Sequence, residues 1–233
     1  MTTTETPTTP SPRVTPLQVE IWSDVACPWC YIGKRRFAVD LSRFEHGAAV
    51  EVRWRSFELD PSAPAVREPA YVDHLAGKYG VDTAEAEDMI DRMIEAGARN
   101  GVVLRFDKAR PSNTFDAHRL LHLAADRGVQ PALEERLFHA AFTKGQPMAD
   151  VDVLVTLAEA AGLEGGEARA VLESDRYATD VRADERRAAD LGITFVPFFV
   201  FDGKLGVAGA ESSELLHRVI EEAWAERQVA QAS

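Results

Sequence analysis

Ser23-Asp24-Val25-Ala26-Cys27-Pro28-Trp29-Cys30 decides the fold of this chain, because it holds both cysteines of the 233 residues in one Cys-x-x-Cys motif. Residues 17–22, just before it, are rich in large apolar types and predict a strand. Residues 27–45 carry apolar side chains at helical spacing and predict a helix. The dithiol therefore lies at a strand-to-helix junction. Two cysteines three apart on a first helical turn share one face, at a spacing that suits a disulfide.

This position predicts different roles for the two cysteines. Cys27 is expected at the amino end of the helix, where free backbone N–H groups and the helix dipole favour a thiolate. Cys30 lies one turn deeper and is expected to be more buried. We therefore expect Cys27 to attack and Cys30 to resolve, through a mixed disulfide on Cys27. Pro28 and Trp29 complete the active-site motif as an exposed turn, with the Trp29 ring beside the thiols.

Two other uses of a cysteine pair fit this sequence less well. A structural zinc site normally has four ligands, but the chain has no second cysteine pair, and His46, the nearest histidine, lies beyond the expected helix. His118 and His122 share a helix face but lack the glutamate of the zinc-protease pattern, so no metal site is predicted. Inert core cysteines are a weaker explanation, because Pro28 and Trp29 favour an exposed turn.

Composition narrows the class of protein. The formal net charge is −12, from 26 basic and 38 acidic residues, which argues against nucleic-acid and anionic-membrane partners because both require a basic face. No apolar run approaches the roughly 18 residues of a membrane span. Residues 1–16 are rich in Thr and Pro and are expected to be a disordered tail without the features of a secretory signal. A cytoplasmic location is the expectation, and there a paired dithiol is typically catalytic rather than structural.

The first part of the chain predicts a βαβ unit followed by a helical middle. Residues 50–55 alternate in polarity and complete a right-handed βαβ unit over residues 17–57, with parallel strands. Prolines then break the pattern. Beyond them, helical spacing predicts segments over residues 70–79, 83–99, 113–127, 131–143, 151–161 and 167–190, the last with or without a break.

The end of the chain returns to a strand pattern. Val196-Pro197 opens the strand Phe198–Phe201, Asp202-Gly203 is a strong hairpin turn, and a return strand follows. The proline is either simply tolerated at a strand start or forms a cis-proline loop packed against the dithiol. Ser212 or Ser213 is expected to cap a final helix. The order βαβ, helices, ββα predicts one α/β sheet that is split in sequence by a helical insertion.

Three segments together resemble the DsbA family of thioredoxin-fold proteins, in its cytoplasmic FrnE-like branch. The segments are Cys27-Pro28-Trp29-Cys30, Gly192-Ile193-Thr194-Phe195-Val196-Pro197-Phe198-Phe199-Val200, and Ser112-Asn113-Thr114-Phe115-Asp116-Ala117-His118-Arg119-Leu120. The resemblance covers residues 17–227. It implies a thioredoxin-like fold, an α/β mixed sheet in the order βαβ … ββα, with a large all-helical domain inserted.

The resemblance also implies a division into domains. Residues 17–62 and 191–227 would form one discontinuous thioredoxin-like domain, and residues 63–190 the inserted helical domain. Residues 228–233 would be a tail. The two halves of the sheet would then meet across the insertion, which would form a lid over the cleft.

Several residues are predicted to contact substrate on the strength of the resemblance. It implies that Pro197 is cis and faces Cys27, and that the Val196 backbone pairs with a bound substrate in strand-like fashion. It also implies that the segment with Asn113 and His118 faces the dithiol. Without the resemblance, Asn113 is most simply a helix N-cap and His118 an ordinary helix residue.

Other polar residues lie near the ends of expected elements. Glu211 and Ser212 come just before the final helix, whose N-terminus suits a carboxylate such as that of glutathione, with plain capping as the alternative. Asp24, three residues before Cys27, is either a cap of the turn or a proton acceptor for the buried thiol. Both interpretations stay open at the level of sequence.

The sequence predicts a thiol–disulfide oxidoreductase that acts on protein disulfides or small thiols. No tightly bound cofactor is expected beyond the redox-active disulfide, with glutathione or another low-molecular-weight thiol as a candidate co-substrate. The alternative is a glutathione-dependent isomerase or transferase of the kappa-class or hydroxychromene-carboxylate isomerase type, whose members typically have serine where Cys27 stands. A third possible function is that of a non-catalytic binding module, but this function would leave the dithiol without a role. The sequence leaves open the direction of electron flow and the recycling partner. It also leaves open the oligomeric state, for which a homodimer is one possibility.

Overall fold

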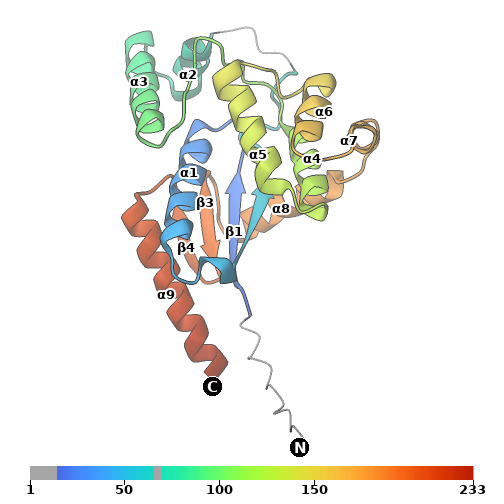
Figure 1. Cartoon of the computed structure of the whole chain (residues 1–233). Coiled ribbons are helices and arrows are strands. Elements are labelled where there is room, and N and C mark those ends of the chain that lie inside the picture. Colours follow the sequence, from blue (N-terminus) through green and yellow to red (C-terminus); the bar gives the residue numbers. More distant parts are fainter. Residues whose placement is uncertain (1–14, 66–69, 233) are drawn as a thin grey trace, which may run out of the picture.

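A four-stranded mixed sheet forms the centre of the protein (Figure 1). The computed structural model describes residues 15–65 and 70–232. The strand order is β2-β1-β3-β4, with β1 parallel to β2 and antiparallel to β3, and β3 antiparallel to β4. The strands are β1 (Leu17–Ser23), β2 (Val50–Ser56), β3 (Phe198–Phe201) and β4 (Leu205–Ala208). The predicted βαβ unit and late hairpin are both present.

The helices follow the predicted order. α1 (Pro28–Arg43) joins β1 to β2, and α9 (Ser213–Ala232) ends the described chain. Between the two halves of the sheet lie α2 (Tyr71–Tyr79), α3 (Thr83–Arg99), α4 (Phe115–Asp126), α5 (Gln130–His139), α6 (Val151–Ala160), α7 (Gly165–Leu172) and α8 (Ala178–Asp190). A 3-10 turn (Gly47–Ala49) precedes β2, and a π-helical turn (Ala140–Lys144) extends α5. None of the described helices is long and apolar enough to cross a membrane.

The structure defines three boundaries that the sequence left open or placed elsewhere. The segment over residues 167–190 is broken, because the backbone at Tyr177 is left-handed, with a φ of 63°, and a right-handed helix cannot continue through it. Residues 228–232, expected in a tail, instead extend α9, since alanine and glutamine there are good helix formers. The predicted disordered tail over residues 1–16 lies outside the described residues except for its last two.

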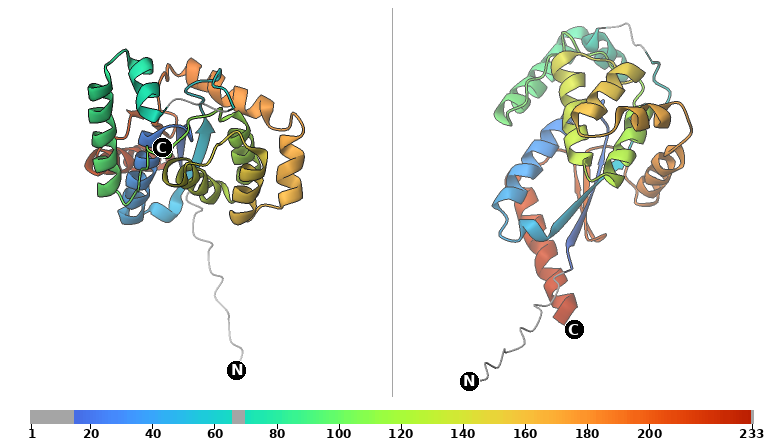
Figure 2. Two further views of the ribbon diagram at one scale, coloured as in Figure 1. Left: turned by 90° about the horizontal axis from the view of Figure 1, so that it is seen from above. Right: turned by 45° about the vertical axis from the view of Figure 1, so that its right-hand side comes forward.

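Strand β1 is the buried centre of the sheet. Ile21 is completely buried and lies between Trp54 on β2 and Phe199 on β3. Phe37 of α1 packs on this same face, with its ring centroid 5.5 Å from that of Phe199, and Leu216 of α9 joins the same apolar cluster. Helices α1 and α9 therefore cover one face of the sheet together (Figure 2).

Helix α8 covers the opposite face and is held there by polar contacts. The completely buried Trp22 indole on β1 donates to the backbone oxygen of Asp184 at 3.0 Å. The Asp184 carboxylate accepts from the Arg55 guanidinium at 2.8 Å and from the Ser56 backbone N–H at 3.0 Å. α8 thus packs on the sheet although it lies inside the predicted 63–190 insertion, whereas α2 to α7 stand beyond the carboxyl end of β1 (Figure 1).

The insertion has an apolar core of its own and shares a second one with the sheet. Leu133 and Leu154 belong to the cluster that joins α4, α5, α6 and α7. The shared cluster contains Cys30 of α1 together with Met93 of α3 and Val200 of β3. The dithiol is therefore buried in the seam between the sheet and the insertion.

Helix α1 comes very close to the loop before β3 at Gly33. A Cβ atom at this position would lie 3.0 Å from Pro197 Cγ and 3.6 Å from the Phe199 ring. The first distance is shorter than an ordinary van der Waals contact, so only glycine lets the helix and the loop approach this far. The approach fixes Pro197 against the turn of α1 that follows Cys30.

Replacing Gly33 with valine should therefore destabilise the protein by about 1–3 kcal/mol, because the branched side chain overpacks against Pro197. Urea unfolding at equilibrium measures the change. Gly166→Val is the matched control, since a Cβ atom at this glycine of α7 meets nothing within 4 Å. Equal losses of stability in the two variants would contradict the close approach.

Candidate active site

The two cysteines lie at the start of α1, at different depths. Cys27 is the N-cap residue of α1 and Pro28 is its first residue. The first turn carries no acidic side chain that would oppose a thiolate. Cys27 is 5% exposed, Cys30 is completely buried, and both are free thiols. A substrate sulfur can therefore approach Cys27 more readily than Cys30.

The loop before β3 brings Val196 and Pro197 to the cysteines from the far end of the chain. The Cys27 thiol donates to the backbone oxygen of Val196 at 3.6 Å, across 169 residues of sequence. The Val196–Pro197 peptide bond is cis. β3 holds this loop in place because it pairs with β1, the strand that leads into the dithiol. The site thus has two walls, one from each half of the sheet.

The burial of Cys30 also makes its thiol harder to ionise. Burial raises the pKa of the Cys30 thiol well above its usual value, and the adjacent Cys27 raises it further. The Asp24 backbone acts in the opposite direction, because a hydrogen bond from the backbone favours the thiolate. At neutral pH Cys30 is therefore a neutral thiol that must lose a proton before it can attack.

Asp24 braces the turn that leads into Cys27. Its carboxylate is 1% exposed and accepts from the backbone N–H groups of Ala26 at 3.1 Å and Leu59 at 2.7 Å. It also lies 3.4 Å from His118 Nε2. Burial opposes ionisation of Asp24, but His118 and the two backbone N–H donors together outweigh burial, so the pKa of the carboxyl is lowered. Likewise, Asp24 raises the pKa of His118 against the effect of that residue's own burial. These contacts favour the capping role for Asp24.

A second buried carboxyl belongs to Glu134 of α5, which pairs with Lys34 of α1 at 3.2 Å. Burial raises the pKa of Glu134 to about 7, although Lys34 opposes the rise. Ser23, His118 and Glu134 line a small cavity of about 10 Å³, which has room for about one water molecule. The Ser23 hydroxyl, which is buried without a hydrogen-bond partner among the described residues, therefore faces the same small space as the Glu134 carboxyl.

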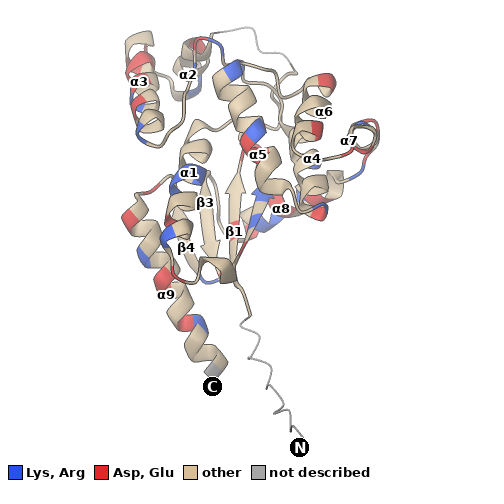
Figure 3. Cartoon of the chain, in the orientation of Figure 1, with Lys and Arg blue, Asp and Glu red and all other residues tan. Residues whose placement is uncertain are grey.

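The sequence analysis missed Glu134 and Lys34. A single glutamate in a helical segment is usually exposed, and nothing in its neighbourhood marks it as buried. The available signal is Lys34, which follows Cys30 by four residues and so shares its face of α1. Elsewhere, basic and acidic residues are interspersed along the helices (Figure 3). The Lys34–Glu134 pair lies between α1 and α5, with 11% and 1% of the two side chains exposed.

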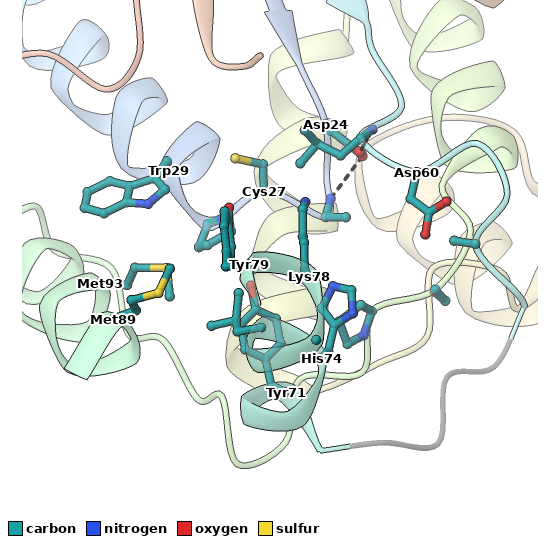
Figure 4. A pocket seen from close by; sticks show the side chains of 18 of the residues that line it. Asp24, Cys27, Trp29, Asp60, Tyr71, His74, Lys78, Tyr79, Met89 and Met93 are labelled. Carbon is teal, nitrogen blue, oxygen red and sulfur yellow. Dashed lines mark hydrogen bonds between the residues drawn. The ribbon is translucent and has the colours of Figure 1, made fainter. Parts of the chain in front are cut away.

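Cys27 borders a cavity of about 660 Å³ that lies between the start of α1 and the α2–α3 hairpin (Figure 4). Trp29, 37% exposed, stands at its edge, as predicted for an exposed ring beside the thiols. Met89 and Met93 of α3 lie across the cavity from Trp29 (Figure 4). Tyr71 contributes from α2. A molecule in this cavity would lie directly beside the sulfur predicted to attack.

The residues predicted to contact substrate from the start of α4 have local partners. Asn113 precedes Thr114, the N-cap residue of α4, and its Oδ1 accepts from the Phe115 backbone N–H at 3.0 Å, whereas its neighbours Ser112 and Thr114 line the cavity. The His118 side chain is 1% exposed and lies behind Asp24. His118 therefore lies under the active-site turn, which it reaches through the Asp24 carboxylate, and a direct contact of His118 with substrate stays a prediction.

The predicted contacts before α9 have local partners. Ser212 Oγ accepts from the Leu215 backbone N–H at 3.3 Å, which is a plain capping bond. The Glu211 backbone oxygen accepts from the Arg36 guanidinium at 3.1 Å. Neither residue is among those that line the cavity beside Cys27. A role for Glu211 and Ser212 in binding a carboxylate stays a prediction.

Comparison with known proteins finds one family and several similar folds. The model of the DSBA-like thioredoxin domain family matches residues 18–221. A probable DsbA oxidoreductase from Streptomyces coelicolor has a TM-score of 0.86 and 44% sequence identity, over 90% of this chain and 91% of that one. A 2-hydroxychromene-2-carboxylate isomerase has a TM-score of 0.68 and 14% identity, over 93% of this chain and 99% of that one. The cytosolic disulfide reductase DsbM from Pseudomonas aeruginosa, solved with GSH, has a TM-score of 0.60 and 18% identity, over 92% and 100%. The last two similarities concern the fold alone.

Iodoacetamide should label the two cysteines at different rates. In Cys30→Ser, the remaining Cys27 should react readily at pH 7. In Cys27→Ser, the buried Cys30 should react at least about tenfold more slowly and speed up only in alkaline solution, because burial raises the pKa of its thiol. Mass spectrometry of the intact proteins over a pH series measures both rates. Equal labelling at pH 6 would contradict the assigned depths.

Glu134→Gln should change how stability depends on pH. Since the pKa of Glu134 is raised from 4.5 to about 7 on folding, its contribution to stability is fully present below pH 4.5 and is lost as the pH rises through 7. The unfolding free energy of the wild type minus that of the variant should therefore fall by about 3 kcal/mol over this range. Urea titrations at several pH values measure the difference. Glu135→Gln, the next residue on α5 and partly exposed, is the control, and the same pH dependence in both variants would sink the assignment.

Proposed function

Because the chain belongs to the DSBA-like thioredoxin domain family, we propose that it is a thiol–disulfide oxidoreductase whose redox-active sulfurs are those of Cys27 and Cys30. The observation that carries the proposal is the arrangement of this pair. Cys27 caps α1, borders a cavity and contacts the Val196 backbone oxygen, while Cys30 is buried one turn later. These are the two cysteines of the whole chain, so the chemistry takes place between them and a substrate.

The proposed reaction moves two electrons between the protein and a disulfide substrate. The Cys27 thiolate attacks one substrate sulfur, the substrate S–S bond breaks, and one substrate thiolate leaves and takes up a proton. Cys30 then loses its proton and attacks the Cys27 sulfur, which forms the Cys27–Cys30 disulfide and releases the second substrate thiol. The same steps in reverse oxidise a substrate dithiol. The direction depends on the reduction potential of the pair against its surroundings.

The resolving step requires a group that takes the proton from Cys30. The Ser23 hydroxyl is buried without a hydrogen-bond partner in the part of the chain that the structure describes. It lines the same small cavity as Glu134, at the end of the strand that leads into the dithiol. A carboxyl with a pKa of about 7 is partly ionised near neutral pH, which suits it to exchanging a proton there. Glu134 is therefore assigned as the acceptor, by way of Ser23, and Asp24 as the brace that holds the turn.

The scheme involves no tightly bound cofactor. Glutathione or another low-molecular-weight thiol would return electrons to the disulfide, and protein disulfides or small thiols would be the substrates. The cytoplasm is the proposed location, and its reducing conditions favour reductase or isomerase action over net oxidation. In support, one protein of similar fold is named a cytosolic disulfide reductase.

A glutathione-dependent isomerase is the second candidate, because a 2-hydroxychromene-2-carboxylate isomerase has a similar fold over nearly the whole chain. Isomerisation of a bound thioether or adduct needs one sulfur at most. The buried Cys30, placed to attack Cys27, has no task in such a reaction. The complete dithiol therefore favours disulfide exchange.

Cys27→Ser should abolish the reduction of insulin disulfides, and Cys30→Ser should accumulate a mixed disulfide on Cys27, because the second attack is then missing. Turbidity of the released insulin chain and mass spectrometry of the intact protein are the two measurements. Full activity in Cys27→Ser would refute the redox assignment. Isomerase turnover in a variant without either cysteine would establish the second candidate instead.

A further inference from the structure

We propose that the cavity beside Cys27 binds a large apolar side chain flanking the disulfide-bonded cysteine of an extended peptide substrate, and that Gly77 of α2 sets the size of that side chain. The inference rests on the proposed function, because Cys27 fixes where the substrate sulfur must lie. It goes further by naming a substrate class and a residue that determines specificity. Three observations carry it: the chemistry of the wall, the charges around it and the open space at Gly77.

The wall nearest the reactive sulfur is apolar and aromatic. Met93 is buried in the same apolar cluster as Cys27, and Met89 and Met93 face Trp29 across the cavity (Figure 4). Burial, and then the charge at Cys27, raise the pKa of the Tyr71 phenol, which places this ring near the sulfur. Methionine and aromatic side chains adapt to apolar groups of different shape. A side chain next to the substrate cysteine would be removed from water when it packs against this wall.

The charged groups of the cavity suit a peptide better than an anionic thiol. The lining carries the carboxylates of Asp24, Asp60 and Asp73, and its basic side chains are those of Lys78 and His74. No arginine is among the described lining residues, so none of them offers a bidentate clamp for the carboxylates of a thiol such as glutathione. An uncharged apolar side chain therefore meets less electrostatic repulsion in this cavity than an anionic thiol does.

Gly77 leaves open space on the α2 side of this cavity. It is one of the lining residues, and a Cβ atom built on it would meet no atom within 4 Å. Glycine in a helix is unfavourable compared with alanine, so α2 itself gains nothing from having it here. A larger side chain at this position would extend into the open space without displacing the protein. Gly77 therefore controls how much of the cavity a substrate can use.

The experiment measures how fast Cys27 forms a mixed disulfide in the full-length Cys30→Ser protein. The probes are symmetrical disulfides of three peptides, with phenylalanine, serine or glutamate on both sides of the cysteine, and oxidised glutathione. Attack by the Cys27 thiolate breaks the probe S–S bond, forms one protein–peptide disulfide and releases one peptide thiolate, so no other reductant is needed. Rapid quenching and mass spectrometry give each rate. The phenylalanine peptide should react about tenfold faster than the serine peptide, a difference of about 1.4 kcal/mol.

Gly77→Leu should reduce this tenfold preference to about twofold or less, because leucine fills the space that the phenylalanine ring would use. Gly77→Ala should keep most of the preference. Gly166→Leu is the matched control, since this helical glycine of α7 also has no atom within 4 Å of a built Cβ, and it should keep the full preference. Circular dichroism before each run confirms that the variants are folded.

Three results would overturn the inference, and they are distinguishable. If Gly77→Leu keeps the preference for phenylalanine, the cavity does not bind the flanking side chain although Cys27 still exchanges disulfides. If oxidised glutathione or the glutamate peptide reacts fastest and Gly77→Leu slows it, the occupant is an anionic thiol. If no probe forms a disulfide with Cys27 in any variant, the proposed function fails and this inference fails with it.

Discussion

The buried carboxylate of Asp24 is the contact on which the rest of the structure depends. It holds the backbone of Ala26 in the turn before the dithiol, the backbone of Leu59 after β2, and the His118 imidazole of α4. One side chain therefore joins the active-site turn, the exit from the first βαβ unit and the helical insertion. Because Asp24 is charged and nearly unexposed, it tolerates this position only while all three partners are present. The insertion and the turn of Cys27 are in this way fixed to each other by one ion pair and two hydrogen bonds.

Two acids in the seam between sheet and insertion show how environment assigns different tasks to the same functional group. Asp24 has two backbone donors and a histidine, so its pKa is lowered and it remains an anion that positions the chain. Glu134 has Lys34 as its direct partner and is otherwise desolvated, so its pKa rises to about 7 and it can exchange a proton. The Ser23 hydroxyl, at the end of β1, lines the same small cavity as the second acid. The first acid therefore fixes geometry, and the second is suited to chemistry.

Patterns that act over a few residues were sufficient to predict most of the fold. The Asp202-Gly203 dipeptide predicts a tight hairpin, and both residues have the positive φ, 51° and 70°, that such a turn requires. The spacing of Cys27 and Cys30 also predicts their depths on α1. Contacts between distant segments were harder to predict from sequence. His118 has the pattern of an ordinary helix residue, and only the structure shows Asp24 beside it. Glu134 has no neighbours in sequence that mark it as buried. The packing of α8 on the sheet escaped prediction for the same reason, because Trp22 and Asp184 are 162 residues apart.

The long separation between the two walls of the site has a consequence for biosynthesis. During translation the dithiol leaves the ribosome early, whereas the loop that covers Cys27 follows 169 residues later. Until β3 pairs with β1, that central strand has an open edge and Cys27 lacks the Val196 carbonyl. For most of the synthesis of the chain, the Cys27 sulfur is thus without the second wall of its site. Under the proposed function, a nascent chain would exchange disulfides without selection until the final hairpin is in place.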